Sequence, residues 1–128
     1  MLNKVHLIGN LGKDPVLRHT STGKDVVELS VATSNSWKGK DGSTQNDTEW
    51  HRVVAWGNLA NSCANNLSKG SKAYVEGRIQ TRDWEDKEGN KRSSTEIIAN
   101  RVLFLSGRAP KETSEGQGDL YSDDEIPF

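Results

Sequence analysis

The sequence predicts an all-β domain followed by a disordered acidic tail. Between residues 3 and 105, short apolar or alternating runs are separated by turn residues, which is typical of a domain built from strands. Only residues 58–70 carry a convincing helix pattern. After residue 105 the chain is rich in Gly, Ser, Glu and Gln, and it cannot bury enough apolar surface to become ordered. The 128-residue chain therefore divides into a domain at residues 1–108, a flexible linker at residues 109–122 and a tip at residues 123–128.

The strands are predicted from their alternation and from the turns between them. The first strand covers residues 3–11, with Gly9 marking a bulge or bend, and residues 16–20 continue in extended form. A turn leads into the second strand, and a long polar loop separates the second strand from the third. A charged loop with Gly89 at its turn separates the fourth strand from the fifth. The remaining strands are expected at residues 26–34, 48–56, 71–84 and 94–105, with the polar loop at residues 38–47.

The order of these elements predicts the architecture. The helix of residues 58–70, stopped by Gly70, falls between the third and fourth strands. Five strands with one short helix at this place is the order of an OB-fold barrel. We therefore expect a five-stranded OB-fold barrel.

Composition excludes several classes of protein. A single cysteine allows no internal disulfide, and no Cys or His spacing predicts a zinc site. No apolar run approaches the roughly 18 residues of a membrane span, and the N-terminus does not have the pattern of a signal peptide. We expect a cytoplasmic protein without membrane contact, cofactor or metal.

The net charge of −1 conceals a strong polarity along the chain. Residues 1–108 hold 16 Lys and Arg against 12 Asp and Glu, a balance of +4, whereas residues 109–128 hold 1 against 6, a balance of −5. A basic domain is suited to a nucleic-acid partner. The acidic tail is expected to occupy the basic surface of the domain when nucleic acid is absent.

The four tryptophans are the main candidates for function. In the third strand, alternation places Trp50, Arg52 and Trp56 on one face. In the fourth strand it places Arg78, Gln80, Arg82 and Trp84 in one row, and Trp37 is followed by two lysines. Aromatic faces between cations suit an unpaired nucleic-acid strand, because bases stack on the rings and the backbone needs countercharge. The alternative is that the tryptophans are core anchors; it is reasonable for one ring, above all Trp56, but not for all four together.

Other candidate motifs are weaker. Gly9, Gly12 and Lys13 lack the spacing of a phosphate-binding loop. Cys63 has no His or Lys near it in the sequence and is interpreted as a packed structural cysteine. The three histidines form no metal or general-base pattern. The acids between Asp83 and Glu88 are interpreted as a solvated hairpin rather than the carboxylate site of a small nuclease, so no catalytic residue is expected.

Several stretches of the chain are specific when they are taken together: NKVHLIGNLGKDPVLR, VATSNSW, TEWHRVVAWGNLA, LSKGSKAYVEGRIQTRDW, STEIIANRVLFL and the final DDEIPF. Together they resemble the bacterial single-stranded DNA-binding proteins. It implies an OB-fold homotetramer that wraps single-stranded DNA without sequence preference in the nucleoid and recruits replication, recombination and repair proteins. An OB-fold RNA-binding protein remains the alternative.

The resemblance also assigns roles to particular residues. It implies base stacking by Trp37, Trp50, Trp56 and Trp84, and phosphate contacts by Arg52 and Arg82. It implies subunit contacts by the first strand, His51, Tyr74 and Glu76, in competition with the interpretation of the whole fourth strand as a binding face. Two departures stand out: Trp56 replaces the phenylalanine usual in the family, and the linker is much shorter than usual.

The tip, DDEIPF, predicts a protein-binding segment. Pro127 opposes helix and strand formation, which keeps Ile126 and Phe128 available to a partner pocket. A basic rim around such a pocket would pair with the α-carboxylate of Phe128 and with the acids Asp123, Asp124 and Glu125.

Overall fold

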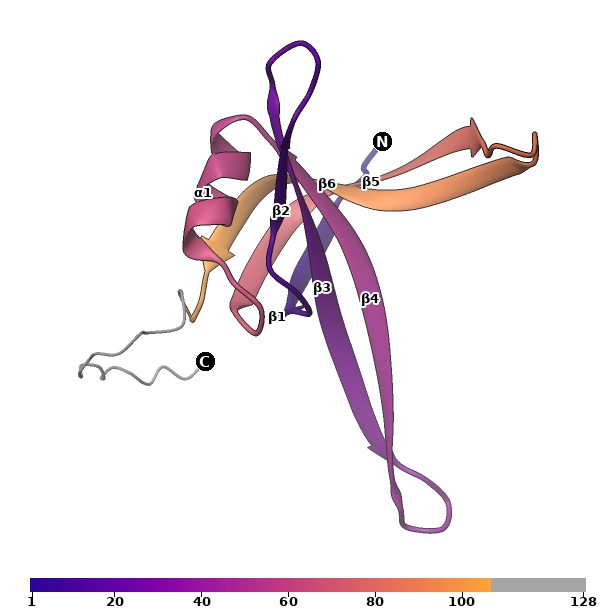
Figure 1. The fold of residues 1–128 in the computed structure, drawn as a ribbon. Coiled ribbons are helices and arrows are strands. Elements are labelled where there is room, and N and C mark those ends of the chain that lie inside the picture. Colours follow the sequence, from indigo (N-terminus) through magenta and orange to yellow (C-terminus); the bar gives the residue numbers. More distant parts are fainter. Residues whose placement is uncertain (107–128) are drawn as a thin grey trace, which may run out of the picture.

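The computed structural model describes residues 1–106 (Figure 1). Six strands and one helix follow one another in this part of the chain: β1 (Val5–Leu11), β2 (Val16–His19), β3 (Asp25–Lys38), β4 (Thr44–Trp56), α1 (Asn58–Asn66), β5 (Lys72–Glu85) and β6 (Lys91–Phe104). Within residues 1–106, no helix is long and apolar enough to cross a membrane.

Five of the strands close into a barrel, as the sequence predicts. The sheet order is β1-β5-β6-β4-β3-β2, and β1 also pairs with β3 through Asn10↔Ala32 and Leu11↔Val31. Strand β2 pairs with β3 alone among these strands, so it adds a hairpin to the barrel and is not counted in its closure. The helix lies between β4 and β5, which are the third and fourth barrel strands.

Gly9 permits the closure of the barrel. It was predicted to form a bulge or bend, but it pairs regularly with Ala73 of β5. A Cβ atom at this position would lie 2.3 Å from the carbonyl oxygen of Ala32. Glycine is therefore required because β1 passes close to the backbone of β3 where it changes partners.

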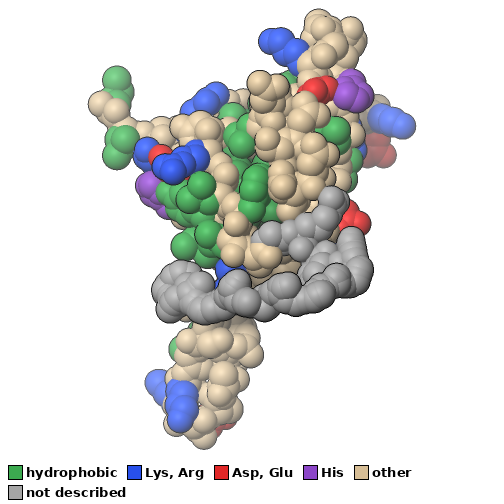
Figure 2. All heavy atoms as spheres, turned by 90° about the vertical axis from the view of Figure 1, so that its left-hand side faces the viewer, with side chains coloured by type: hydrophobic (Ala, Val, Ile, Leu, Met, Phe, Trp, Pro, Cys, Tyr) green, Lys and Arg blue, Asp and Glu red, His purple; other side chains and the backbone are tan. Residues whose placement is uncertain are grey.

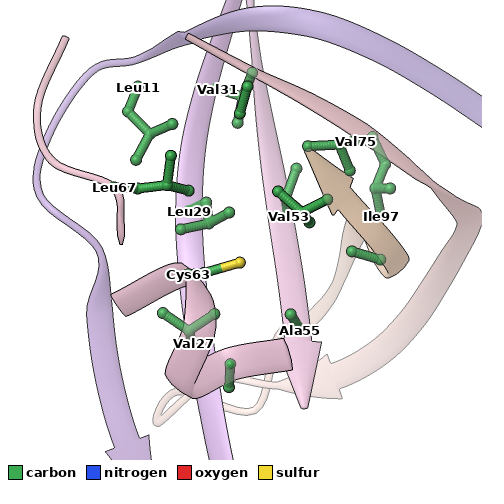
Figure 3. Packing of buried hydrophobic residues seen from close by; sticks show 14 residues of the cluster. Leu11, Val27, Leu29, Val31, Val53, Ala55, Cys63, Leu67, Val75 and Ile97 are labelled. Carbon is green, nitrogen blue, oxygen red and sulfur yellow. The ribbon is translucent and has the colours of Figure 1, made fainter. Parts of the chain in front are cut away.

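Side chains of the barrel strands and the helix form one buried cluster (Figure 3). The alternation predicted for β3 places Val27, Leu29 and Val31 inside, each at most 1% exposed. Burying an aliphatic side chain of this size stabilises the fold by about 1.5–3 kcal/mol. Cys63 of α1 also lies in the cluster, and burial raises the pKa of its thiol to about 11. At neutral pH this cysteine is a packed, unreactive thiol, as expected.

The helix ends earlier than the sequence suggests. It was predicted to continue to Gly70, but Leu67 already has an extended backbone and is buried in the core cluster. Gly70 has a φ of 90° and belongs to the turn that follows, where its N–H donates to the carbonyl of Leu11. The helix thus ends before the glycine is reached, next to a leucine that packs in the core.

Two hairpins extend from the barrel as arms (Figure 1). The β3–β4 arm is paired from Thr33↔Glu49 to Lys38↔Thr44, and the β5–β6 arm from Thr81↔Thr95 to Glu85↔Lys91. The first arm corrects the prediction of a long polar loop at residues 38–47, because only residues 39–43 lie outside the strands. Figure 2 shows this arm projecting from the body, with Lys and Arg side chains near its end.

Candidate nucleic-acid interface

A groove runs over the outer surface of the strands that carry the predicted binding residues. It encloses about 530 Å³ and is lined from β2 to β6. Four arginines and the indole of Trp56 lie along it, together with two glutamates that the strand pattern does not mark as functional. The charged lining residues are Arg18, Arg52, Arg78, Arg82, Glu28 and Glu96.

All four tryptophans are exposed, as predicted. Their exposed fractions are 49% for Trp37, 57% for Trp50, 46% for Trp56 and 44% for Trp84, so the alternative of core anchors is wrong. Trp50 and Trp56 lie on β4, while Trp37 and Trp84 lie on the two arms. The rings therefore extend from the barrel onto both arms.

Trp50 rests against the turn after β1. A Cβ atom built on Gly12 would lie 2.3 Å from Cζ3 of the indole and 2.7 Å from Cη2. The ring thus packs on the backbone where only glycine leaves space. From the sequence, Gly12 is a candidate only for a phosphate loop, because the strand pattern does not show that Trp50 lies above it.

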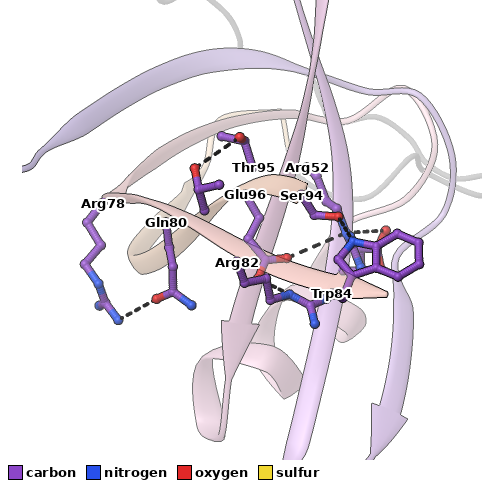
Figure 4. A network of polar contacts seen from close by, with 10 residues as sticks. Arg52, Arg78, Gln80, Arg82, Trp84, Ser94, Thr95 and Glu96 are labelled. Atoms are coloured by element: carbon purple, nitrogen blue, oxygen red, sulfur yellow. Dashed lines mark hydrogen bonds and ion pairs between the residues drawn. The ribbon is translucent and has the colours of Figure 1, made fainter. Parts of the chain in front are cut away.

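Trp84 is held by a hydrogen bond across the β5–β6 arm. Its indole N–H donates to Oγ of Ser94 at 2.9 Å (Figure 4). The ring also borders a hollow of about 490 Å³ that Lys91 and Arg92 line from the facing strand, together with Asp83 and Glu85 of its own strand. Arg92 is paired with Asp86 at 3.1 Å, so Lys91 is the cation of this hollow that makes no ion pair within residues 1–106.

Arg52 and Arg82 are paired with carboxylates in the groove. Arg52 contacts Glu28 through two atoms, with Nε 3.1 Å from Oε2 and Nη2 3.2 Å from Oε1. Glu96, whose side chain is only 7% exposed, lies 3.3 Å from Nε of Arg82 and 3.8 Å from Nε of Arg52 (Figure 4). Two arginines and two glutamates thus form a neutral cluster, called the arginine–glutamate cluster below.

Strand β5 has two different halves. Its second half carries Arg78, Gln80 and Arg82 into the groove, as the row predicted from the sequence requires. Its first half carries Tyr74, which contacts His6 of β1, and Glu76, which contacts Lys4 just before β1. The groove thus takes up the second half of the strand, and the subunit contacts predicted for Tyr74 and Glu76 in the first half stay a prediction.

A second polar network lies on the outside of β1 and β5 and consists of Lys4, His6, Tyr74 and Glu76. The hydroxyl of Tyr74 donates to Oε1 of Glu76 at 3.0 Å and lies 2.8 Å from Nδ1 of His6. Lys4 Nζ lies 2.7 Å from Glu76, and this hydrogen bond, with that of Tyr74, lowers the pKa of the Glu76 carboxyl.

Exposed aliphatic side chains flank this network. Ile8 pairs with Tyr74 across β1 and β5 and is 60% exposed, and Leu103 pairs with Tyr74 across β5 and β6 and is 40% exposed. We call Ile8, Leu103 and the second polar network together the outer face. His51 lies elsewhere: it is half-buried on β4, and its Nε2 lies 2.9 Å from Oγ1 of Thr33. In residues 1–106, no hydrogen bond or ion pair joins His51 to Tyr74 or Glu76.

The remaining predictions concern parts of the chain that the structure does not describe. The linker and the tip residues Asp123, Asp124, Glu125, Ile126, Pro127 and Phe128 lie outside the described residues. Within residues 1–106, no group of three or more His, Cys, Asp or Glu side chains could hold a metal ion.

Sequence comparison identifies related proteins over nearly the whole chain. The model of the single-strand binding protein family matches residues 2–105. Single-stranded DNA-binding protein 1 of Chlorobaculum tepidum is 47% identical over 119 residues, which cover 92% of this chain and 72% of that protein. The protein of the same name from Xylella fastidiosa is 46% identical over 127 residues, which cover 98% and 91% of the two chains.

Solved structures show the same fold. The Plasmodium falciparum SSB in complex with ssDNA superposes with a TM-score of 0.75 at 32% identity, covering 82% of this chain and 96% of that one. A deletion mutant of the single-stranded DNA binding protein from Thermus aquaticus gives a TM-score of 0.71 at 33% identity. That match covers 81% of this chain and 50% of the other.

Proposed function

This chain belongs to the single-strand binding protein family, and we propose that it binds single-stranded DNA without sequence preference. The observation that carries the proposal is the exposure of all four indoles, between 44% and 57%, on β4 and the two arms next to the arginine-lined groove. Such rings expose flat apolar surfaces that a soluble domain would otherwise bury.

The chemistry of these side chains favours an unpaired strand. Each base can stack on an indole, which contributes about 1–3 kcal/mol and depends little on the base because every base has a π-face. Arg18 and Arg78 line the groove, and no ion pair involving them is found within residues 1–106, so they can meet phosphates directly. A duplex keeps its bases stacked inside and offers them no access to the rings.

Titration of intrinsic tryptophan fluorescence with oligo-dT, repeated over a range of salt concentrations, tests the proposal. We expect strong quenching of the fluorescence, because bases that stack on the indoles quench their emission. We also expect an affinity that falls steeply with salt, because neutralisation of the phosphates releases counterions. Duplex DNA of the same length is the control and should compete weakly. Absence of quenching, or equal competition by the duplex, would contradict the proposal, and preferential displacement by single-stranded RNA would favour an RNA-binding function.

We further propose that the protein acts in replication, recombination and repair in the cytoplasm, at the nucleoid, and that the tip recruits partner enzymes. Support comes from the sequence DDEIPF, which ends an acidic segment with two large apolar residues. Deletion of Phe128 should leave DNA binding intact and abolish capture of purified helicases or nucleases of these pathways. Leu120→Ala is the matched control, since it removes an apolar side chain outside the tip. Unchanged capture by the Phe128 deletion would refute this role.

We also propose that the acidic tail competes with DNA for the groove. The balance of −5 in residues 109–128 opposes the +4 of residues 1–108, and low salt should strengthen this attraction. A chain truncated after residue 108 should therefore bind short oligonucleotides more tightly at low salt. Equal affinity of the full and truncated chains would exclude the competition.

Assembly into a homotetramer is the last part of the proposal. The outer face supports it, because Ile8 and Leu103 are exposed while the charged groups between them already satisfy one another. Such a surface is suited to burial against a second copy. Sedimentation equilibrium should give four times the mass of the 14.1 kDa chain; a monomer over the micromolar range would contradict this part.

A further inference from the structure

The arginine–glutamate cluster is neutral at the place where the groove should attract phosphate most strongly. Arg52 and Arg82 contribute two positive charges, and Glu28 and Glu96 contribute two negative charges within 3.8 Å of them. By contrast, Arg18 and Arg78 line the same groove and make no ion pair within residues 1–106. The two kinds of arginine must therefore respond differently to an incoming phosphate.

The two glutamates have different freedom to leave the cluster. The side chain of Glu96 is 7% exposed and lies between both guanidinium groups, so releasing it would leave a buried carboxylate unpaired. The side chain of Glu28 is 30% exposed and contacts Arg52 alone among the described arginines. Only Glu28 can turn toward water at small cost.

Glu28 also covers the atoms of Arg52 that a phosphate would use. It occupies both Nε and Nη2, in the two-point geometry by which a guanidinium binds carboxylate or phosphate. Arg52 is 39% exposed and shares the groove lining with Trp56. A phosphate that reaches this guanidinium in the same geometry must replace the carboxylate.

We propose that Glu28 is a built-in competitor of phosphate: it binds Arg52 in the free protein, and DNA binding exchanges this carboxylate for a backbone phosphate while Glu96 keeps both arginines in place. This inference rests on the proposed single-stranded DNA binding and adds a residue that limits its affinity. The exchange limits how strongly the groove holds DNA, because Arg52 gains one anion only by losing another.

The exchange has a measurable signature in the salt dependence of binding. Each phosphate neutralised by a free cation steepens the slope of log K against log salt by about 0.7 for single strands. In wild type, Arg52 contributes little to this slope, because the negative charge of Glu28 offsets its positive charge. Glu28→Gln keeps the shape of the side chain and removes its charge, so the slope should become steeper by about 0.7, and Kd should fall about eightfold near 50 mM salt and about threefold near 200 mM.

The experiment measures Kd for a fluorescein-labelled oligo-dT by anisotropy in wild type, E28Q, R52Q, the double variant E28Q/R52Q and the control E88Q. Glu88 lies in the turn between β5 and β6, and no ion pair involving it is found in residues 1–106, so E88Q makes the same change of net charge outside the cluster. In the R52Q background the charge at position 28 should alter the slope little, because the competition acts through Arg52.

The outcomes separate this inference from the proposed function. If wild type fails to bind oligo-dT, the proposed function fails. If wild type binds but E28Q binds no more tightly, changes the slope no more than E88Q, or has the same effect with and without Arg52, the built-in competitor is wrong. Circular dichroism melting of each variant shows whether it folds, and the milder Glu28→Asp, which shortens the side chain and weakens the two-point contact, should give a smaller shift of the same sign.

Discussion

The groove and the outer face are both surfaces with exposed apolar and charged groups, but they combine these groups in opposite ways. The groove adjoins exposed indoles and contains two arginines, Arg18 and Arg78, without an ion-pair partner in residues 1–106. The outer face exposes aliphatic Ile8 and Leu103 around charges that pair with one another. One strand, β5, contributes to both surfaces, so the difference arises from side chains and not from the backbone.

Because of this contrast, we expect the two surfaces to suit different ligands. Indoles and available cations suit a ligand with flat bases and a charged backbone, which remains partly hydrated. Aliphatic groups around an internally satisfied polar network suit a second protein surface, which excludes water. The predictions below test whether the two surfaces can be disabled separately, from the largest expected effect to the smallest.

Loss of two indoles should have the largest effect. In Trp50→Ala/Trp84→Ala we expect single-strand affinity to fall by about 2–6 kcal/mol, because stacking contributes about 1–3 kcal/mol per base and the rings lie on different strands. Anisotropy of a labelled oligo-dT measures the loss without relying on tryptophan. The matched control Tyr74→Phe changes an aromatic residue of the outer face and should keep the affinity within about twofold. A double variant that binds like wild type would contradict the stacking of bases on these indoles.

The second-largest effect is expected on assembly, when a charge is placed on the outer face. Ile8→Arg replaces a 60% exposed isoleucine, and burying it in an interface would contribute about 1.5–3 kcal/mol per copy. We expect sedimentation velocity to show smaller species than in wild type. Leu17→Arg, at a position 38% exposed on β2, is the control and should sediment like wild type. If both variants sediment like wild type, the outer face is not an interface.

The sequence predicted what depends on alternation and failed where partners come from other strands. The period of β4 was enough to place Trp50, Arg52 and Trp56 together on the outer surface, because side chains of a strand alternate by geometry alone. Glu28 and Glu96 could not be found in this way. They contact Arg52 from β3 and β6, and periodicity gives the face of a residue but not its neighbour across the sheet.

The length of the β3–β4 arm was missed for a different physical reason. Residues 35–38 and 44–47 are all exposed, so no alternation of apolar and polar residues marks them as strand. They pair through the backbone ladder and through side-chain contacts such as the hydrogen bond that Oγ of Ser36 donates to Oδ1 of Asn46 at 2.5 Å. The end of the helix was missed because Gly70 suggested a later stop, and periodicity does not show that Leu67 is extended and packed in the core.

Gly12 should have a smaller effect than the indoles themselves. In Gly12→Ala the new methyl group would meet the Trp50 ring, and we expect the displaced ring to cost about 1 kcal/mol of DNA affinity, within the range of one stacking contact. The three nearest atoms to such a Cβ all belong to Trp50. The same change in the Trp50→Ala background should therefore have little further effect. A loss of equal size in both backgrounds would mean that Gly12 acts through the backbone.

The smallest effect concerns the pH dependence of the outer face. Hydrogen bonds from Lys4 and Tyr74 lower the pKa of Glu76 below its usual 4.5. A depressed carboxyl pKa contributes stability that is present above the unfolded value and is lost as pH falls through the folded value. Melting temperatures of wild type and Glu76→Gln should therefore differ at pH 7 and converge as the pH falls below 4.5 and through the lowered pKa of the folded state.

The groove supplies the contrast for this last prediction. Because Glu76 contacts Lys4 and Tyr74 and no described groove arginine, Glu76→Gln should leave the affinity for oligo-dT at pH 7 nearly unchanged, whereas Glu28→Gln should raise it. Parallel melting curves of wild type and Glu76→Gln from pH 7 to pH 3 would show that the Lys4–Glu76 pair does not stabilise the fold. A changed oligo-dT affinity would show that the two surfaces are coupled, since a carboxylate on one would then act on the other.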